Sequence, residues 1–228
     1  MCGRFTLTRQ EAAELAAELG VPIESLPAYR PRYNIAPTDD HWIVRTKYED
    51  RELLPAKWGL VNSWAKDARR AAAQINARAE TLTTRSAFKE AFAKRRCVVP
   101  ADGFFEWVGP KNARQPVWFH RPDRGLILFA GLYEYWQQGA DDWLRSFTIV
   151  TTDANATVEP IHDRMPVILS DEAADVWMLP GARPEDALDL LVPAPEDALI
   201  ATRVSPRANS VKNDDAGVLE AVANPTLL

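Results

Sequence analysis

Cysteine and histidine, the residues that most often bind metal ions or carry redox chemistry, are scarce in this sequence. Its 228 residues include two cysteines, Cys2 and Cys97, and three histidines. None of them stand at the spacings typical of a metal site, so we expect no metal ion and no other cofactor. With Cys2 as a reactive terminal residue, a disulfide to Cys97 is not expected, which favours a reducing cytoplasm as the compartment.

Long apolar segments are also missing. No run approaches the ~20 residues that span a bilayer, and the first residues lack a basic region followed by an apolar stretch, so we expect neither a membrane span nor a signal peptide. Hydrophobic residues make up 46% and charged residues 26% of the chain, as in ordinary globular proteins. A chain of this length suffices for one core. We expect a single domain over residues 1–228 and a monomer.

The charge of the chain is unevenly distributed. The net charge is −5, but residues 1–122 hold 20 Lys and Arg against 14 Asp and Glu, a net of +6, whereas residues 123–228 hold 7 against 18, a net of −11. Phosphate binding depends on local potential rather than on the total. The net acidity therefore does not exclude a nucleic-acid partner, and the asymmetry permits a basic face built mainly from the first half.

The pattern of apolar residues predicts many strands and few helices. A capping box at 8–11 and apolar residues at helical spacing predict a helix that ends at Gly20. Further helices are predicted at 86–95, 171–179 and 184–191, and strands at 41–47, 52–58, 97–100, 103–108, 117–120, 126–136, 146–152, 165–169 and 199–204. The strands from 117 to 169 are expected in one sheet. This content predicts an α+β fold with a mixed or antiparallel, curled, barrel-like sheet and a few peripheral helices.

Cys2 directly follows the initiator methionine, which is normally removed when the second residue is small. The mature chain is then expected to begin at Cys2, which would carry an α-amine and a thiol on one residue. The amine has a pKa of about 7.7–8.0, so its neutral fraction at pH 7 can attack an aldehyde to form a Schiff base. The thiol can then close a thiazolidine ring. By position alone, a buried small hydrophobe is the commoner role for a cysteine such as Cys2.

Polar residues interrupt strand or turn patterns at three further places. Asn76 and Arg78 are two apart and share a face if the segment is extended, although an exposed strand edge explains them equally well. Glu106 lies among aromatic residues, where desolvation raises a carboxyl pKa towards the range useful for acid–base catalysis; the alternative is a strand carboxylate paired with an arginine. His162 lies in a turn between two prolines, where a structural role is the alternative to a catalytic one.

Six stretches, four of which contain these residues, occur in order along the chain. Together they resemble the SOS response-associated peptidase (SRAP) family, whose members crosslink covalently to abasic sites in single-stranded DNA. The stretches are 1–5 (MCGRF), 31–38 (PRYNIAPT), 58–60 (WGL), 76–81 (NARAET), 100–107 (PADGFFEW) and 162–166 (HDRMP). The chain departs from the family pattern at Asn62, where proline is expected, and at 205–209. The resemblance implies the SRAP fold and a cytoplasmic, nucleoid-associated protein.

The resemblance also implies catalytic roles for four residues. The Cys2 aminothiol would capture the C1′ aldehyde of a ring-opened abasic sugar as a thiazolidine. Glu106 would transfer protons during Schiff-base formation and ring closure, His162 would assist sugar ring opening and crosslink reversal, and Asn76 would position the sugar and the nucleophile. The same terminal chemistry explains the word peptidase, through removal of Met1 by self-processing or by an aminopeptidase.

Five residues are expected at the DNA. The resemblance matches Arg4, Arg78 and Arg164 to arginines that contact phosphates, which suits guanidinium geometry. It further implies that Asn34 completes the pocket and that Trp64 stacks on flanking bases.

Two other functions remain open on the sequence. An N-terminal-nucleophile amidohydrolase or peptidase also opens with Met-Cys-Gly and uses the terminal thiol on an amide. A non-covalent single-strand-binding module would leave Cys2 incidental.

Overall fold

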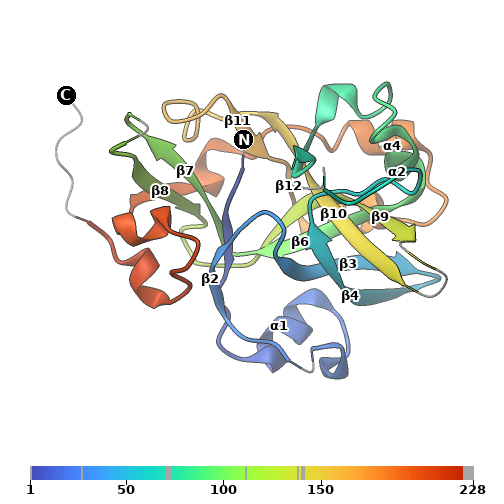
Figure 1. Ribbon diagram of the computed structural model, residues 1–228, viewed down its shortest axis with the longest axis horizontal. Coiled ribbons are helices and arrows are strands. Elements are labelled where there is room, and N and C mark those ends of the chain that lie inside the picture. Colours follow the sequence, from blue (N-terminus) through green and yellow to red (C-terminus); the bar gives the residue numbers. More distant parts are fainter. Residues whose placement is uncertain are drawn as a thin grey trace.

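The chain folds into two β-sheets with short helices around them (Figure 1). The computed structural model describes residues 2–26, 28–69, 73–110, 112–137, 139 and 142–222. The strands in these residues are β1 (Phe5–Leu7), β2 (Arg32–Ile35), β3 (Asp40–Lys47), β4 (Asp50–Trp58), β5 (Asn76–Arg78), β6 (Arg96–Ala101), β7 (Gly103–Val108), β8 (Gln115–His120), β9 (Ile127–Gln137), β10 (Trp143–Asp153), β11 (Arg164–Pro166), β12 (Ile168–Leu169) and β13 (Ile200–Arg203). The α-helices are α1 (Ala12–Leu19), α2 (Lys89–Lys94), α3 (Asp171–Met178) and α4 (Pro184–Leu188).

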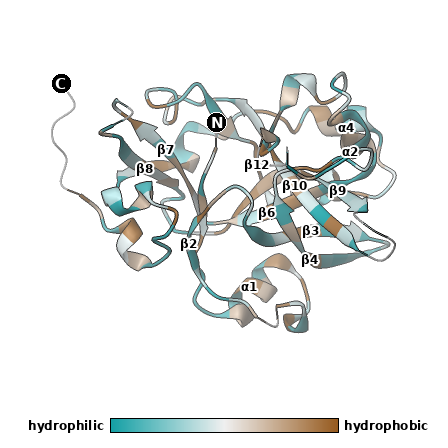
Figure 2. Ribbon diagram, in the orientation of Figure 1, coloured by the Kyte–Doolittle hydropathy of each residue, from teal (hydrophilic) through white to brown (hydrophobic). Residues whose placement is uncertain are grey.

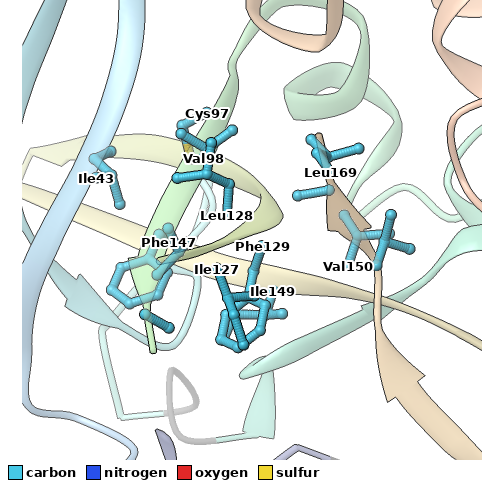
Figure 3. Packing of buried hydrophobic residues seen from close by; sticks show 14 of the residues in the cluster. Ile43, Cys97, Val98, Ile127, Leu128, Phe129, Phe147, Ile149, Val150 and Leu169 are labelled. Carbon is cyan, nitrogen blue, oxygen red and sulfur yellow. The ribbon is translucent and has the colours of Figure 1, made fainter. Parts of the chain in front are cut away.

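The larger sheet closes into a barrel. β10 pairs with β4, β4 with β3, β3 with β6, β6 with β9, and β9 again with β10, so five strands form a ring. The β4–β10 pair is parallel and the other four are antiparallel. Fully buried side chains, among them Ile43, Phe129, Phe147 and Ile149, pack in its core (Figure 3). The predicted α+β class and curled, mixed sheet are confirmed.

The smaller sheet has the strand order β13-β8-β7-β1-β2. The expectation that 117–120 and 126–136 share a sheet was wrong. β8 pairs with β7 and β13, whereas β9 pairs with barrel strands. Alternating apolar residues identify a strand but not its partner, and the chain changes sheets at the single residue Asp102, between β6 and β7.

The helices are shorter than predicted. The prediction of a capping box at 8–11 was wrong. The Thr8 backbone N–H and hydroxyl both donate to Asp102, and Glu11, the residue before α1, makes no side-chain cap. Gly20 ends α1 with a positive φ of 65°, as expected. Ser170 caps α3 by accepting a hydrogen bond from the Ala173 N–H.

The chain start lies between the two sheets (Figure 1). β1 pairs with β7 and β2 in the smaller sheet, while Phe5 packs edge-on against His41 and Trp58 of the barrel. Along β10, polar and apolar residues are interspersed (Figure 2), and Phe147 and Ile149 are buried. No helix in the described residues is both long and apolar enough to cross a membrane. Because β1 contacts both sheets, each sheet can contribute side chains around Cys2.

Candidate functional site at the start of the chain

Cys2 is enclosed by strands from both sheets. Its side chain is fully buried, and its backbone carbonyl accepts a hydrogen bond of 2.8 Å from the Asn76 side-chain amide. The next contact along the chain is made by Arg4, whose carbonyl accepts from the Phe105 N–H at 3.0 Å. Burial, followed by the charge of Glu106, raises the pKa of the Cys2 thiol well above its usual range. The thiol is therefore protonated at neutral pH.

Asn76 is held by a short parallel pairing. β5 runs beside β10, with Asn76 opposite Ile149 and the buried Ala77 opposite Val150. The segment is extended, so Asn76 and Arg78 lie on one face of it. The side-chain oxygen of Asn76 is buried and has no hydrogen-bond partner among the described residues. A buried amide oxygen without a donor is unfavourable unless a ligand or water supplies one, so this acceptor is suited to a substrate hydroxyl or amine.

Glu106 is the acidic group of the site. It lies on β7 between Phe105 and Trp107, and only 5% of its surface is exposed. Burial raises its pKa from 4.5 to about 7, and the charge of Asp163 adds to the rise. A carboxyl group with this pKa both donates and accepts protons at neutral pH. A raised pKa was predicted, but its cause is burial of the carboxyl, because Phe105 and Trp107 lie together on the opposite face of β7.

His162 lies at the end of a tight turn that precedes β11. Its backbone N–H donates to the Val158 carbonyl, and its ring Nδ1 accepts a 3.0 Å hydrogen bond from the Arg164 N–H. Partial burial lowers its pKa below the usual value. The same Nδ1 also lies 2.9 Å from a carboxylate oxygen of Asp163, so a donor and an acceptor both meet this ring nitrogen.

Arg164 is placed differently from the other expected phosphate ligands. Its side chain is 9% exposed and forms ion pairs with Asp153 at 2.6 Å and Glu80 at 2.8 Å. It also donates to the Thr151 carbonyl. Both carboxylates are largely exposed, so a phosphate would have to replace one of them. The sequence could not reveal these partners, because they come from β10 and from the segment after β5.

Arg4 lines a pocket of about 600 Å³ beside Gly3. Its Nη1 donates to the Asn34 side chain at 2.7 Å and to the Ala208 carbonyl at 3.0 Å, and its guanidinium lies over the Trp107 ring. Asn34 is 1% exposed, so the structure places it behind Arg4 and not at the pocket surface. The pocket is lined by Gly3, Arg4, Pro37, Trp107, Asn112, Ala113, Arg114 and Asn209.

A second pocket, of about 670 Å³, lies beside Trp64. The Trp64 side chain is 65% exposed, and Arg85 lines the same pocket. Asn62 is buried and donates to the Ala87 carbonyl at 2.6 Å, which anchors this loop where the family was expected to have proline. Arg78 is exposed on β5. Met1 and residues 70–72 lie outside the described residues.

Sequence reasoning missed three residues of the first pocket. Trp107, Arg114 and Asn209 face the same space as Arg4, and Trp107 donates to the Asn209 side chain at 2.7 Å. Trp107 belongs to the PADGFFEW stretch and could have been proposed from its position beside Glu106. Asn209 could not, because it follows the last strand by several residues. In the described part of the chain, no group of three His, Cys, Asp or Glu residues is arranged to hold a metal ion.

Proteins of similar sequence have been described in bacteria and vertebrates. The chain is 38% identical to the abasic site processing protein YoqW of Bacillus subtilis over 226 residues, covering 97% of this chain and 100% of that protein. It is 32% identical to the abasic site processing protein YedK of Escherichia coli, with 97% and 100% covered. The Xenopus tropicalis abasic site processing protein HMCES is 30% identical, with 85% of this chain and 67% of that protein covered.

Solved structures and a family model agree with these relatives. A protein of Bacteroides thetaiotaomicron has the same fold, with a TM-score of 0.85, 24% identity, and 97% and 100% of the two chains covered. A Bordetella bronchiseptica protein matches with a TM-score of 0.75, 26% identity, and 90% and 100% covered. The model of the family described as SOS response associated peptidase (SRAP) matches residues 1–211. The chain therefore belongs to the SRAP family.

Proposed function

We propose that this protein captures abasic sites in single-stranded DNA as a covalent thiazolidine at Cys2, after removal of Met1, and thereby shields the lesion. The observation that carries the proposal is the enclosure of Cys2 by the Asn76 amide and by Glu106, whose pKa is about 7. The names of the relatives, abasic site processing proteins, support the substrate class.

The chemistry needs no cofactor. The α-amine of Cys2 adds to the C1′ aldehyde of the ring-opened sugar, and loss of one water gives the Schiff base. The thiol then adds to the imine carbon, and its proton passes to the nitrogen, so that the adduct equals the two reactants less one water. Because the thiol pKa is raised by burial, the amine acts first and the thiol requires a proton acceptor.

Glu106 is the proposed proton carrier. Near pH 7 it is present in both forms, so it can protonate the hydroxyl that leaves as water and accept the thiol proton during ring closure. His162 is proposed to assist opening of the sugar ring. Asn76 is proposed to orient the terminal residue and the sugar through its side-chain amide.

The proposed DNA path follows the basic and aromatic groups around Cys2. Arg4 and the exposed Arg78 would contact phosphates, and Trp64 would stack on a flanking base. Arg164 joins them only if a phosphate replaces Glu80 or Asp153. We further propose a DNA-associated, monomeric protein, with Met1 removed either by this centre or by an aminopeptidase.

A denaturing gel of the protein mixed with abasic single-stranded DNA tests the proposal. We expect a slower band that survives denaturation, is absent with undamaged DNA, and is absent for Cys2→Ala and for a chain whose terminus is acetylated. Equal, salt-sensitive binding by Cys2→Ala and the unaltered protein with no covalent band would indicate the single-strand-binding module. Hydrolysis of glutamine would indicate the amidohydrolase. Either result would overturn the proposal.

A further inference from the structure

The C-terminal segment, residues 205–222, is bound to β2 through hydrogen bonds of residues 208–214. Asp214 accepts hydrogen bonds from the backbone N–H groups of Tyr33 at 2.6 Å and Asn34 at 3.0 Å, and from the Arg32 side chain. One carboxylate thus satisfies two backbone donors of β2 and a guanidinium. The segment also closes on itself, because the Ser205 N–H donates to the Glu220 carbonyl at 2.9 Å.

Asn34 makes the reciprocal contacts from β2. Its side-chain amide donates to the carbonyls of Ala208, Ser210 and Asn213, at 3.3, 3.0 and 2.9 Å. Its oxygen accepts from Arg4 Nη1 at 2.7 Å. The amide therefore connects the C-terminal segment to the guanidinium. Because the Asn34 side chain is 1% exposed, it does not reach a ligand itself.

The Arg4 guanidinium is held by hydrogen bonds along one edge and by the Trp107 ring against one face. Nη1 is shared by the Asn34 oxygen and the Ala208 carbonyl, and the guanidinium carbon lies 5.6 Å from the centre of the Trp107 ring. Among the described residues only Nη1 has hydrogen-bond partners, so Nε and Nη2 remain for a phosphate. An arginine side chain loses conformational freedom when it binds, and prior fixing lowers that cost.

We infer that Asn34 and the C-terminal segment are positioning elements that pre-orient Arg4 for a DNA phosphate. The inference rests on the proposed function, because it assumes that Arg4 contacts DNA. Asn34 was expected to contact the DNA, whereas here it affects DNA binding only by holding Arg4. The inference also gives the residues after β13 a role in binding at the opposite end of the chain.

A double-mutant cycle tests the inference. Binding is measured at several salt concentrations to single-stranded DNA with a tetrahydrofuran abasic analogue, which has no C1′ hydroxyl and cannot form an aldehyde, so no crosslink interferes. Arg4→Ala is expected to weaken binding about tenfold. It should also reduce the slope of log K against log salt by about one, the contribution of one phosphate contact. Asn34→Ala is expected to weaken binding about as much, and to add little in the Arg4→Ala background.

The outcomes separate the two proposals. If Arg4→Ala leaves affinity and salt slope unchanged, the phosphate contact of the proposed function is wrong. If Arg4→Ala weakens binding but Asn34→Ala does not, the positioning role is wrong. It is also wrong if Asn34→Ala weakens binding equally with and without Arg4. Gln115→Ala is the matched control, because its amide also donates to a carbonyl near the segment, that of Val204 at 2.8 Å, without touching Arg4. It should bind normally.

A second variant covers the case in which Asn34→Ala does not fold. Asn34→Asp keeps the shape of the side chain and places a carboxylate beside Arg4, so it should offset the Arg4 charge and reduce the salt slope by about one. An unchanged slope for folded Asn34→Asp would overturn the inference.

Discussion

The side-chain amide of Asn76 holds the backbone carbonyl of Cys2 at 2.8 Å. This hydrogen bond joins the terminal residue to β5, which is itself held beside the barrel strand β10. A chain start is ordinarily mobile. In the proposed crosslinking reaction, this bond would fix the residue whose amine and thiol approach one carbon atom in turn.

Asn76→Ala should therefore slow crosslinking by about 100-fold, because a displacement of about 1 Å of a reacting group has an effect of this size. The rate is measured on denaturing gels with abasic single-stranded DNA. Gln115→Ala, which removes a side-chain amide bond of the same 2.8 Å length far along the chain, serves as the control. Equal rates for Asn76→Ala and the control would contradict the positioning role of Asn76.

The raised pKa of Glu106 should make stability depend on pH. Between pH 4.5 and about 7, the folded protein keeps a proton on Glu106 that the unfolded chain has already released. This stabilising contribution is complete below pH 4.5 and is lost as pH rises through 7. The free energy of unfolding should thus fall over this range by up to about 3 kcal/mol relative to Glu106→Gln. Parallel denaturation curves for the two proteins across this range would show that the carboxyl is not perturbed.

Glu80→Gln should strengthen DNA binding. The exposed Glu80 carboxylate occupies the Arg164 guanidinium at 2.8 Å, and its removal leaves Asp153 and the Thr151 carbonyl to hold the arginine. We expect about threefold tighter binding to the tetrahydrofuran DNA at low salt and a steeper salt dependence. Glu49→Gln, an exposed change in the β3–β4 turn, should have no effect. Weaker or equal binding by Glu80→Gln would remove Arg164 from the DNA path.

Trp64→Ala should weaken single-strand binding by about 1–3 kcal/mol, the usual range for loss of a stacking ring. Its effect on stability should stay within about 0.5 kcal/mol, because the side chain is 65% exposed. Trp143, which is 58% exposed at the start of β10, provides the comparison. If Trp64→Ala and Trp143→Ala change affinity equally, stacking at Trp64 is not specific to the site.

Local features of this fold could be predicted, whereas long-range partners could not. The strands at 41–47 and 52–58 follow from alternation and are present as β3 and β4. The raised pKa of Glu106 was predicted in direction, but its cause is burial of the carboxyl and not the adjacent Phe105 and Trp107, which share the other face of β7. By contrast, Thr8 was assigned to a cap because its true partner, Asp102, is 94 residues away.

The site shows the same division. The terminal aminothiol can be predicted from Cys2 alone, but the carboxylates on Arg164 and the carbonyls on Asn34 come from distant segments. Side-chain chemistry was enough to propose Arg164 and Asn34 as DNA-binding residues. It could not show that carboxylates and carbonyls of the protein already bind them. The extent of the domain, residues 1–228, stays a prediction, since the family model matches residues 1–211.

The intact mass of the protein, measured before and after incubation with an abasic oligonucleotide, tests the central claim most directly. We predict a starting mass that lacks Met1 and a product equal to that mass plus the oligonucleotide less one water. A variant that retains Met1 should form no product. An unchanged mass after incubation, or the same adduct with Cys2→Ala, would contradict capture by the terminal amine and thiol.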